Sequence, residues 1–279
     1  MADNKYDGCY RIGHPGALLA LPDKGDLKVS QSDSTVFNTS ATGAVRALMP
    51  IGYSRRSWDV SIPYIQPDDY APLMELLRTP WLNAPYVWVS PEASATNLLS
   101  PQTAALSAFA SRKVGRVPLT EGGFAASAIS ADPAGYTTIS DAPTLPGKPV
   151  TATARCMQGD ALAPVRVVLR EYGLDDTLVQ ETWSANVAGN VGDTAALSPV
   201  TVTVSSAHAA GVRCTLSIYA AAAFTRPQVT WTDHAVLWGP GEGCPQVAIV
   251  PGDRTVRAAS KTDWYFVRAD VAFTVRELG

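Results

Sequence analysis

Residues that could bind a metal ion or transfer protons are few in this chain. It has three histidines, His14, His208 and His234, and no H-E-x-x-H motif includes any of them. Cys9 and His14 could both coordinate zinc, but a tetrahedral site would need two further ligands. The sequence therefore predicts no metal site and no bound cofactor.

Common signatures of enzymes are also missing from the sequence. There is no G-x-S-x-G nucleophile elbow, and the G-K-P sequence at 147–149 does not fit a phosphate-binding loop. Neighbouring carboxylates at 68–69 and 175–176 invite comparison with the paired acids of glycosidases. The first pair belongs to the start of a predicted helix, and the second lies in a predicted hairpin turn, 173–177. We therefore predict that the chain is not an enzyme.

Aromatic side chains are the strongest candidates for a functional surface. The chain has seven tryptophans, and tryptophan is common in cores, at subunit interfaces and on sugar-stacking platforms. Trp58 and Trp231 lie on alternating apolar faces, which predicts core packing. Trp183 stands between polar segments near a predicted strand end, so it is the best candidate for stacking on a sugar. Tyr136 and Tyr172 are the other candidate platform residues.

The elements that must position these side chains are predicted to be β-strands. Apolar and polar residues alternate with a period of two at 57–64, 200–204, 214–218, 229–237 and 267–276. Turn-forming sequences such as LPDKGD, ADPAG and TLPGKP separate these runs at the spacing of β-sandwiches and barrels. We therefore predict an all-β fold, either a sandwich or a barrel.

Only one segment, 67–78, has a convincing helical pattern. Apolar residues recur on one face, acidic residues stand in its first turn, and Arg78 stands in its last. Pro72 either removes one internal hydrogen bond or moves the start of the helix to about Tyr70.

Domain boundaries are suggested by shifts in composition. An Ala-, Ser- and Thr-rich stretch at 91–111 places one boundary near Pro101, and a Gly- and Pro-rich segment at 239–245 places a second. The glycines Gly239, Gly241 and Gly243 resemble a cofactor-binding loop, but no βαβ pattern surrounds them, so we predict a turn.

Charge and hydropathy limit the classes of function. The formal net charge is −3 and no run of like charges occurs, which argues against a dedicated nucleic-acid binder. The longest apolar stretch, 218–224, is far shorter than the roughly 20 residues of a membrane-spanning helix. The N-terminus does not resemble a secretory signal, so we expect folding in a cytosol with the four cysteines reduced and buried.

Residues 55–101 resemble the N-terminal region of minor tail proteins from tailed phages that infect actinobacteria. There an aromatic strand precedes a short helix, a second aromatic strand and an N-L-L-[ST]-P segment; the matching residues are Trp58, Leu73, Leu76, Leu77, Tyr86, Trp88 and 97–101. The resemblance implies a β-sandwich flanked by one helix, as in tail tube and distal tail proteins.

The middle of the chain resembles the jelly roll of carbohydrate-binding modules. The similarity covers 146–155, 199–204, 211–219 and 229–239, and in the phage family such a module is followed by a motif like WGPGEGCP at 238–245. The implied organisation is a tail-ring β-sandwich from 1–100 and 244–279, with the jelly roll, 101–243, inserted between its parts.

The resemblance implies a structural protein of the phage tail tip, in the virion, made in the cytoplasm of the host bacterium. It would form a homo-oligomeric ring, with a hexamer favoured over a trimer, between the tail tube protein and the tip hub proteins. The jelly roll is expected either to contact host cell-wall glycan or to be an architectural spacer. The alternative function is a free-standing, non-catalytic glycan-binding protein.

Overall fold

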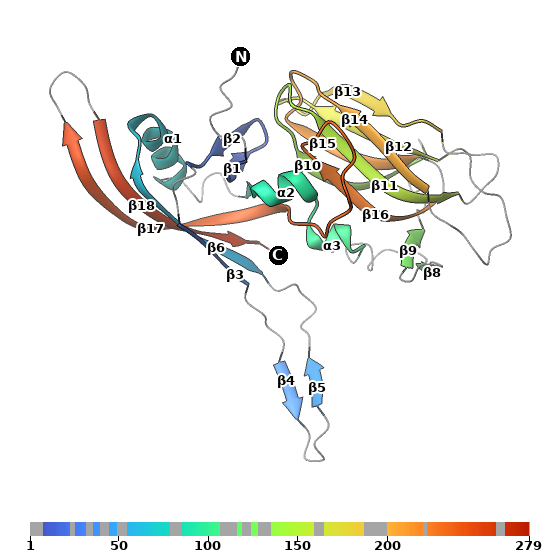
Figure 1. The fold of residues 1–279 in the computed structure, drawn as a ribbon, viewed down its shortest axis with the longest axis horizontal. Helices are drawn as coiled ribbons and strands as arrows, with labels where there is room; N and C mark the ends of the chain where they lie inside the picture. The colour runs from blue at the N-terminus through green and yellow to red at the C-terminus, as the bar shows by residue number, and fades with distance from the viewer. Residues whose placement is uncertain are drawn as a thin grey trace. The chain divides into compact units, whose positions relative to one another are not determined.

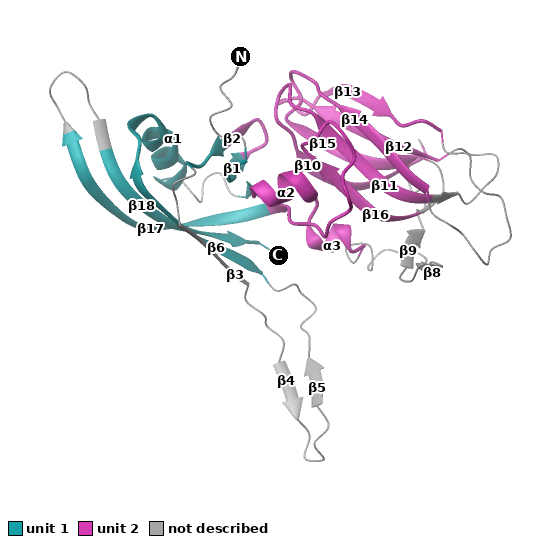
Figure 2. Ribbon diagram, in the orientation of Figure 1, with its two compact units in different colours: residues 1–13, 19–88, 246–279 teal, residues 14–18, 89–245 magenta. Residues whose placement is uncertain are grey.

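The computed structural model describes most of the chain, and the compact parts form two units. The described residues are 8–22, 26–31, 36–39, 45–48, 55–78, 85–106, 116–118, 124–127, 135–158, 165–186, 200–219, 222–260 and 266–278. Unit 1 comprises 1–13, 19–88 and 246–279, and unit 2 comprises 14–18 and 89–245 (Figure 2). Each unit is described below by itself.

The chain is mostly β, which confirms the predicted all-β class (Figure 1). The strands are β1 (Arg11–His14), β2 (Ala17–Ala20), β3 (Asp26–Gln31), β4 (Val36–Thr39), β5 (Val45–Leu48), β6 (Arg56–Ile65), β7 (Tyr86–Val89), β8 (Arg116–Pro118), β9 (Phe124–Ser127), β10 (Tyr136–Pro143), β11 (Val150–Gln158), β12 (Arg166–Tyr172), β13 (Leu178–Trp183), β14 (Val200–Ser206), β15 (Arg213–Tyr219), β16 (Ala222–Thr230), β17 (Cys244–Ser260) and β18 (Phe266–Glu277). The helices are α1 (Pro67–Arg78), α2 (Pro91–Thr96) and α3 (Pro101–Ala104).

Unit 1 is organised by a seven-stranded sheet that joins the two ends of the chain. Its strand order is β2-β1-β7-β17-β18-β6-β3. Strands β6 and β18 are antiparallel, with Trp58 opposite Val275 and Val60 opposite Phe273. These four side chains are buried, so the two alternating runs noted in the sequence share one apolar face.

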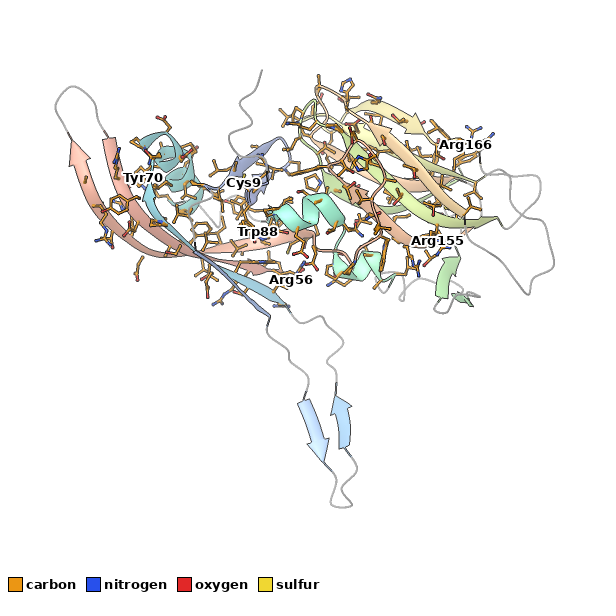
Figure 3. The ribbon with its side chains drawn as sticks, in the orientation of Figure 1. Cys9, Arg56, Tyr70, Trp88, Arg155 and Arg166 are labelled. Carbon is orange, nitrogen blue, oxygen red and sulfur yellow. The ribbon has the colours of Figure 1, made fainter. Side chains whose placement is uncertain are left out.

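Aromatic rings and one ion pair fix this part of the sheet. The centroid of the Trp88 ring lies 5.7 Å from that of Trp58 and 5.3 Å from that of Tyr10. Arg56, labelled in Figure 3, donates from Nε to Glu277 Oε2 at 3.1 Å. Both side chains are 10% exposed. A second guanidinium nitrogen of Arg56 and its backbone N–H also donate to the Glu277 carboxylate. The start of β6 and the end of β18 are thus joined by charge-assisted bonds.

Helix α1 covers the apolar face with Leu73 and Leu77, and it contacts β18. It runs from Pro67 to Arg78 as predicted, so Pro72 removes an internal bond rather than moving the start. Helices α2 and α3 were not predicted. Each begins at the proline of a Ser-Pro pair whose serine caps the helix. Ser90 Oγ accepts from Ala93 N at 3.0 Å, and Ser100 Oγ accepts from Thr103 N at 3.3 Å.

Unit 2 is a sandwich of two antiparallel sheets. The four-stranded sheet has the order β10-β15-β12-β13, and the five-stranded sheet has the order β14-β11-β16-β9-β8. Small or branched apolar side chains fill the space between them; they are Val150, Ala152, Ala154, Val167, Leu169, Val202, Val204, Leu216 and Ile218. Cys156 and Cys214 belong to the same core.

All four cysteines are buried and free, as predicted. Burial raises the pKa of the Cys156 thiol to about 12. Burial also raises the pKa of Cys214. Both thiols are therefore uncharged at neutral pH and pack as small apolar groups.

The outer face of the five-stranded sheet is polar and nevertheless buried. Thr151, Thr153, Gln228 and Thr230 lie on it and are at most 6% exposed. Helices α2 and α3 both contact β16. The Gln228 amide is bonded on both sides: its Nε2 donates to the carbonyls of Thr96 and Leu237, and its Oε1 accepts from Thr153 Oγ1 at 2.9 Å.

Strand β16 ends at Thr230, so the predicted strand 229–237 is wrong beyond its second residue. At Trp231 the backbone leaves the sheet, because its N–H donates to Ser94 O of α2 at 2.8 Å. Trp231 is half-buried beside Pro143, to whose carbonyl its Nε1 donates at 2.9 Å. The alternation seen in the sequence therefore continues through a loop that packs on helix α2.

Asn97 joins the N-L-L-S-P segment to this loop. Its Nδ2 donates to the carbonyls of Pro227 and Gly239 at 3.1 and 3.2 Å. Its Oδ1 accepts from the N–H groups of Leu99 and Val229 at 3.1 and 3.2 Å. The side chain is 0% exposed, and all its hydrogen-bonding capacity is used. We call Asn97, Thr151, Thr153, Gln228 and Thr230 the polar layer.

Two glycines are required where the 239–243 segment crosses residues 98–100. A Cβ on Gly241 would lie 2.4 Å from Leu99 O, and a Cβ on Gly243 would lie 1.7 Å from Leu98 O. The Gly243 N–H donates to Leu99 O at 3.0 Å, which accounts for the close approach. These glycines therefore form a tight backbone contact with 98–100, and residues 239–243 contain no turn, so the predicted turn is wrong.

Replacing Gly243 by alanine is expected to destabilise unit 2 by several kcal/mol, because the contact is with backbone that has no room to move. Gly173→Ala is the matched control, since its Cβ would meet only side-chain atoms, the nearest being Asp175 Oδ1 at 3.1 Å. Thermal unfolding of the two variants checks this. Equal melting temperatures would contradict the assigned role of Gly243.

Candidate glycan-binding surface

The predicted platform residues lie on the outer face of the four-stranded sheet. In the register, Tyr136 and Arg166 both lie opposite Tyr219, and Trp183 lies opposite Val168. β10 and β12 begin where β13 and β15 end, because neighbouring strands are antiparallel. Side chains on the first residues of one pair and the last residues of the other therefore meet at one end of the sheet.

Three aromatic rings form a cluster at this end. The Trp183 ring centroid lies 5.6 Å from that of Tyr136 and 5.3 Å from that of Tyr219, and the two tyrosine centroids are 5.3 Å apart. The rings meet tilted or edge to face, which is the favourable arrangement of aromatic quadrupoles. We call Tyr136, Trp183 and Tyr219 the aromatic cluster. All three side chains are half-buried, so part of each ring faces solvent.

A carboxylate and an arginine hold the cluster in place. Trp183 Nε1 donates to Glu181 Oε1 at 2.8 Å, and Arg170 Nε donates to Glu181 Oε2 at 2.6 Å. The Arg170 guanidinium carbon lies 3.9 Å from the Tyr136 ring centroid. Burial would lower the pKa of Arg170, but its bonds to Glu181 and Tyr136 raise it overall. The arginine therefore stays charged and fixes both rings.

Arg166 is the second cation beside the cluster, and its surroundings differ. Its guanidinium carbon lies 5.3 Å from the Trp183 ring, and its Nε donates to the side-chain oxygen of Asn186. No carboxylate in the described part of the chain pairs with it. Figure 3 labels Arg166 among the side chains of unit 2.

Tyr172 lies at the other end of the same sheet. It is the last residue of β12, whereas Arg166 is the first, which separates them by about 20 Å along the strand. The Arg213 guanidinium carbon lies 4.3 Å from its ring, and Arg213 also pairs with Asp141 at 3.1 Å and Asp176 at 3.0 Å. The structure thus brings Trp183 and Tyr136 together and leaves Tyr172 apart.

Sequence reasoning missed Tyr219 as a member of the cluster. It ends the run in which Cys214, Leu216 and Ile218 face the core, so its position one residue later assigns it to the outer face. Glu181, Arg166 and Arg170 were also missed. Their roles depend on strand pairing, which the sequence pattern did not supply.

Two residues of the outer face next to the cluster are completely buried. Val168 and Ser217 are both 0% exposed and lie opposite each other on β12 and β15. Ser217 Oγ has no hydrogen-bond partner among the described residues. A hydroxyl group in this position is a cost to stability and serves no contact.

The other candidate features considered in the sequence are a carboxylate pair in a turn, a metal site and a membrane-spanning helix. In the predicted turn 173–177, Asp175 Oδ1 accepts from the N–H and hydroxyl of Thr177, which lowers the pKa of Asp175. Among the described residues, no group of three or more His, Cys, Asp or Glu side chains is placed to hold a metal ion. None of the described helices is long and apolar enough to cross a membrane.

No protein-family model and no curated protein sequence matches the chain. Among solved structures, the enzymatically active domain of tailspike protein 4 from bacteriophage CBA120 is 8% identical, with a TM-score of 0.28 over 75% of this chain and 20% of that one. This chain thus spans about a fifth of that tailspike. The infectious bursal disease virus VP2 subviral particle is 10% identical, with a TM-score of 0.25 over 100% of this chain and 83% of that one. Both TM-scores are well below the level that indicates a shared fold.

Ser217→Ala is expected to stabilise the chain by about 1 kcal/mol, because it removes an unpartnered buried hydroxyl group without opening a cavity. Ser206→Ala is the matched comparison. Ser206 Oγ donates to the buried Glu171 carboxylate, so its loss is expected to cost about 1–3 kcal/mol. Urea unfolding of both variants gives the two free energies. Destabilisation by Ser217→Ala would show that the hydroxyl has a partner.

Proposed function

We propose that the chain is a non-enzymatic structural protein of a phage tail tip, built into a ring that joins the tail tube to the adhesion hub. The observation that carries the proposal is the seven-stranded sheet of unit 1. The strand, helix and strand that resemble minor tail proteins are β6, α1 and β7, and the closing strands β17 and β18 lie in the same sheet. This is the arrangement expected if residues 101–243 are an insertion in a tail-ring sandwich.

Open strand edges in unit 1 support assembly into a ring. β17 has 17 residues, whereas its neighbour β7 has 4, so most of one β17 edge extends beyond β7. Residues 251–259 of β17 are all exposed. An edge that no described strand pairs with can pair with another chain, and heterologous contacts between identical copies close into rings. A hexamer is the favoured number, with a trimer as the alternative.

The mass of the full chain in solution tests the ring. Light scattering is expected to give six times the chain mass of 29.5 kDa, with rings visible by negative-stain microscopy. Val256→Asp places a charge on the exposed part of β17 and is expected to shift the protein toward monomer. Thr203→Asp, at an exposed position of β14, is expected to have no effect. A wild-type monomer at every concentration would contradict the ring and favour the free-standing glycan-binding protein.

Contact with host cell-wall glycan is the second proposed function, and the aromatic cluster favours it. Three half-buried rings held by Glu181 and Arg170 form a fixed apolar surface at one end of the sandwich. Sugars present apolar C–H faces to such rings while their hydroxyl groups bond to nearby polar groups. The alternative role for the jelly roll is an architectural spacer that binds no glycan.

Trp183→Ala separates these two roles. Binding to purified actinobacterial cell walls in a sedimentation assay is expected to weaken about tenfold, because one stacking surface is lost. Trp238→Ala is the control, since Trp238 is 41% exposed in the same unit but lies outside the aromatic cluster. Equal binding by wild type and both variants would leave the spacer as the role of the module.

A further inference from the structure

We infer that the aromatic cluster takes an acidic saccharide, one that carries a carboxylate or a phosphate, and that Arg166 recognises the negative charge. This inference rests on the proposed glycan contact and names its ligand class. It depends on how the two arginines beside the cluster differ.

Arg170 is already paired with a carboxylate and packed on a ring within the protein. Its Nε lies 2.6 Å from Glu181 Oε2, and its guanidinium packs on Tyr136. The two charges cancel, and the pair is mostly buried, with side chains 19% and 27% exposed. Arg170 therefore positions the rings and offers no net charge to a ligand.

Arg166 carries a charge that the described part of the chain leaves unbalanced. Its one side-chain hydrogen bond is from Nε to the neutral oxygen of Asn186. A guanidinium has five N–H donors, so four remain for a ligand. Because the group lies against the Trp183 ring, it is oriented before a ligand binds, which lowers the entropy cost of forming a two-point contact.

An anionic sugar matches both features at once. Its ring can lie on the aromatic cluster while its carboxylate or phosphate accepts two parallel bonds from the Arg166 fork. A neutral sugar could stack on the rings but would bring no negative charge to pair with the Arg166 guanidinium. The cluster and Arg166 are adjacent by register, since Arg166 and Tyr136 both lie opposite Tyr219.

The test compares matched ligands on the full chain. Oligogalacturonate, its methyl ester and a phosphomannan are titrated by calorimetry; esterification removes the charge and keeps the sugar ring. Wild-type protein is expected to bind the acid at least about tenfold more tightly than the ester, and more weakly as salt is raised. Binding of the phosphate polymer in place of the uronate identifies phosphate as the source of the charge.

Arg166→Gln is expected to abolish the preference for the acid while leaving weak binding of the ester, and Arg166→Lys is expected to restore only part of it. Arg268→Gln is the control, because it removes one charge from an exposed site in unit 1. Equal affinity for acid and ester overturns the inference and leaves the glycan contact standing. Binding of none of the three polymers also overturns it, and the Trp183→Ala sedimentation assay then decides the glycan contact separately.

Discussion

The buried amide of Asn97 is the interaction on which the architecture of unit 2 depends. The outer face of β11 and β16 carries hydroxyl and amide groups that are hidden from water, and each needs a partner. Asn97 makes four side-chain hydrogen bonds across this layer, one to Leu99 nearby in the sequence and three to residues 227–239. Without it, the Gly239 carbonyl and the N–H groups of Leu99 and Val229 would lose the partner that Asn97 provides, at a cost of about 1–3 kcal/mol for each group left buried and unpaired. The Pro227 carbonyl would keep its bond from Trp238 Nε1.

This constraint explains why two motifs far apart in the sequence belong together. The N-L-L-S-P segment and the Gly-rich 239–243 segment are each other's packing partners, with Glu242 N donating to Asn97 O and Gly243 N to Leu99 O. The chain therefore enters and leaves the sandwich side by side. Adjacent ends are what an inserted module requires, because the host sheet can then continue across a short gap. The polar layer lies on one outer face of the sandwich, and the aromatic cluster lies on the other.

The sequence predicted correctly those elements whose formation depends on residues close together in the chain. Alternation in 267–276 identified the buried face of β18, and alternation in 57–64 identified that of β6 as far as Ile62. Tyr64, which ends that run, is 59% exposed, because the register with β18 shifts and Ile65 is buried in its place. The helical period of 67–78 identified α1. Trp58 is buried as predicted, at 4% exposure. The short helices α2 and α3 were missed because their Ser-Pro caps lie in a stretch that reads as low complexity, although the caps themselves were visible in the sequence.

The features that the sequence did not predict depend on contacts between residues far apart in the chain. Trp231 continues an alternating run but leaves the sheet for Ser94, and nothing near it in the sequence indicates that bond. Tyr136, Trp183 and Tyr219 come from three different strands, so only the pairing register brings them together, and it separates Tyr172 from them. The domain boundaries at 100/101 and 243/244 stay a prediction.

Hydrogen exchange on the intact chain, with and without solubilised cell-wall polysaccharide, is the most direct test. It asks whether glycan binds at the aromatic cluster and leaves the polar layer unchanged. The account predicts slower exchange at the first residues of β10 and β12 and the last residues of β13 and β15. It predicts no change at 97–100 and 239–243, which are protected in both states. Protection confined to the 231–243 segment, or no change anywhere in unit 2, would contradict the account.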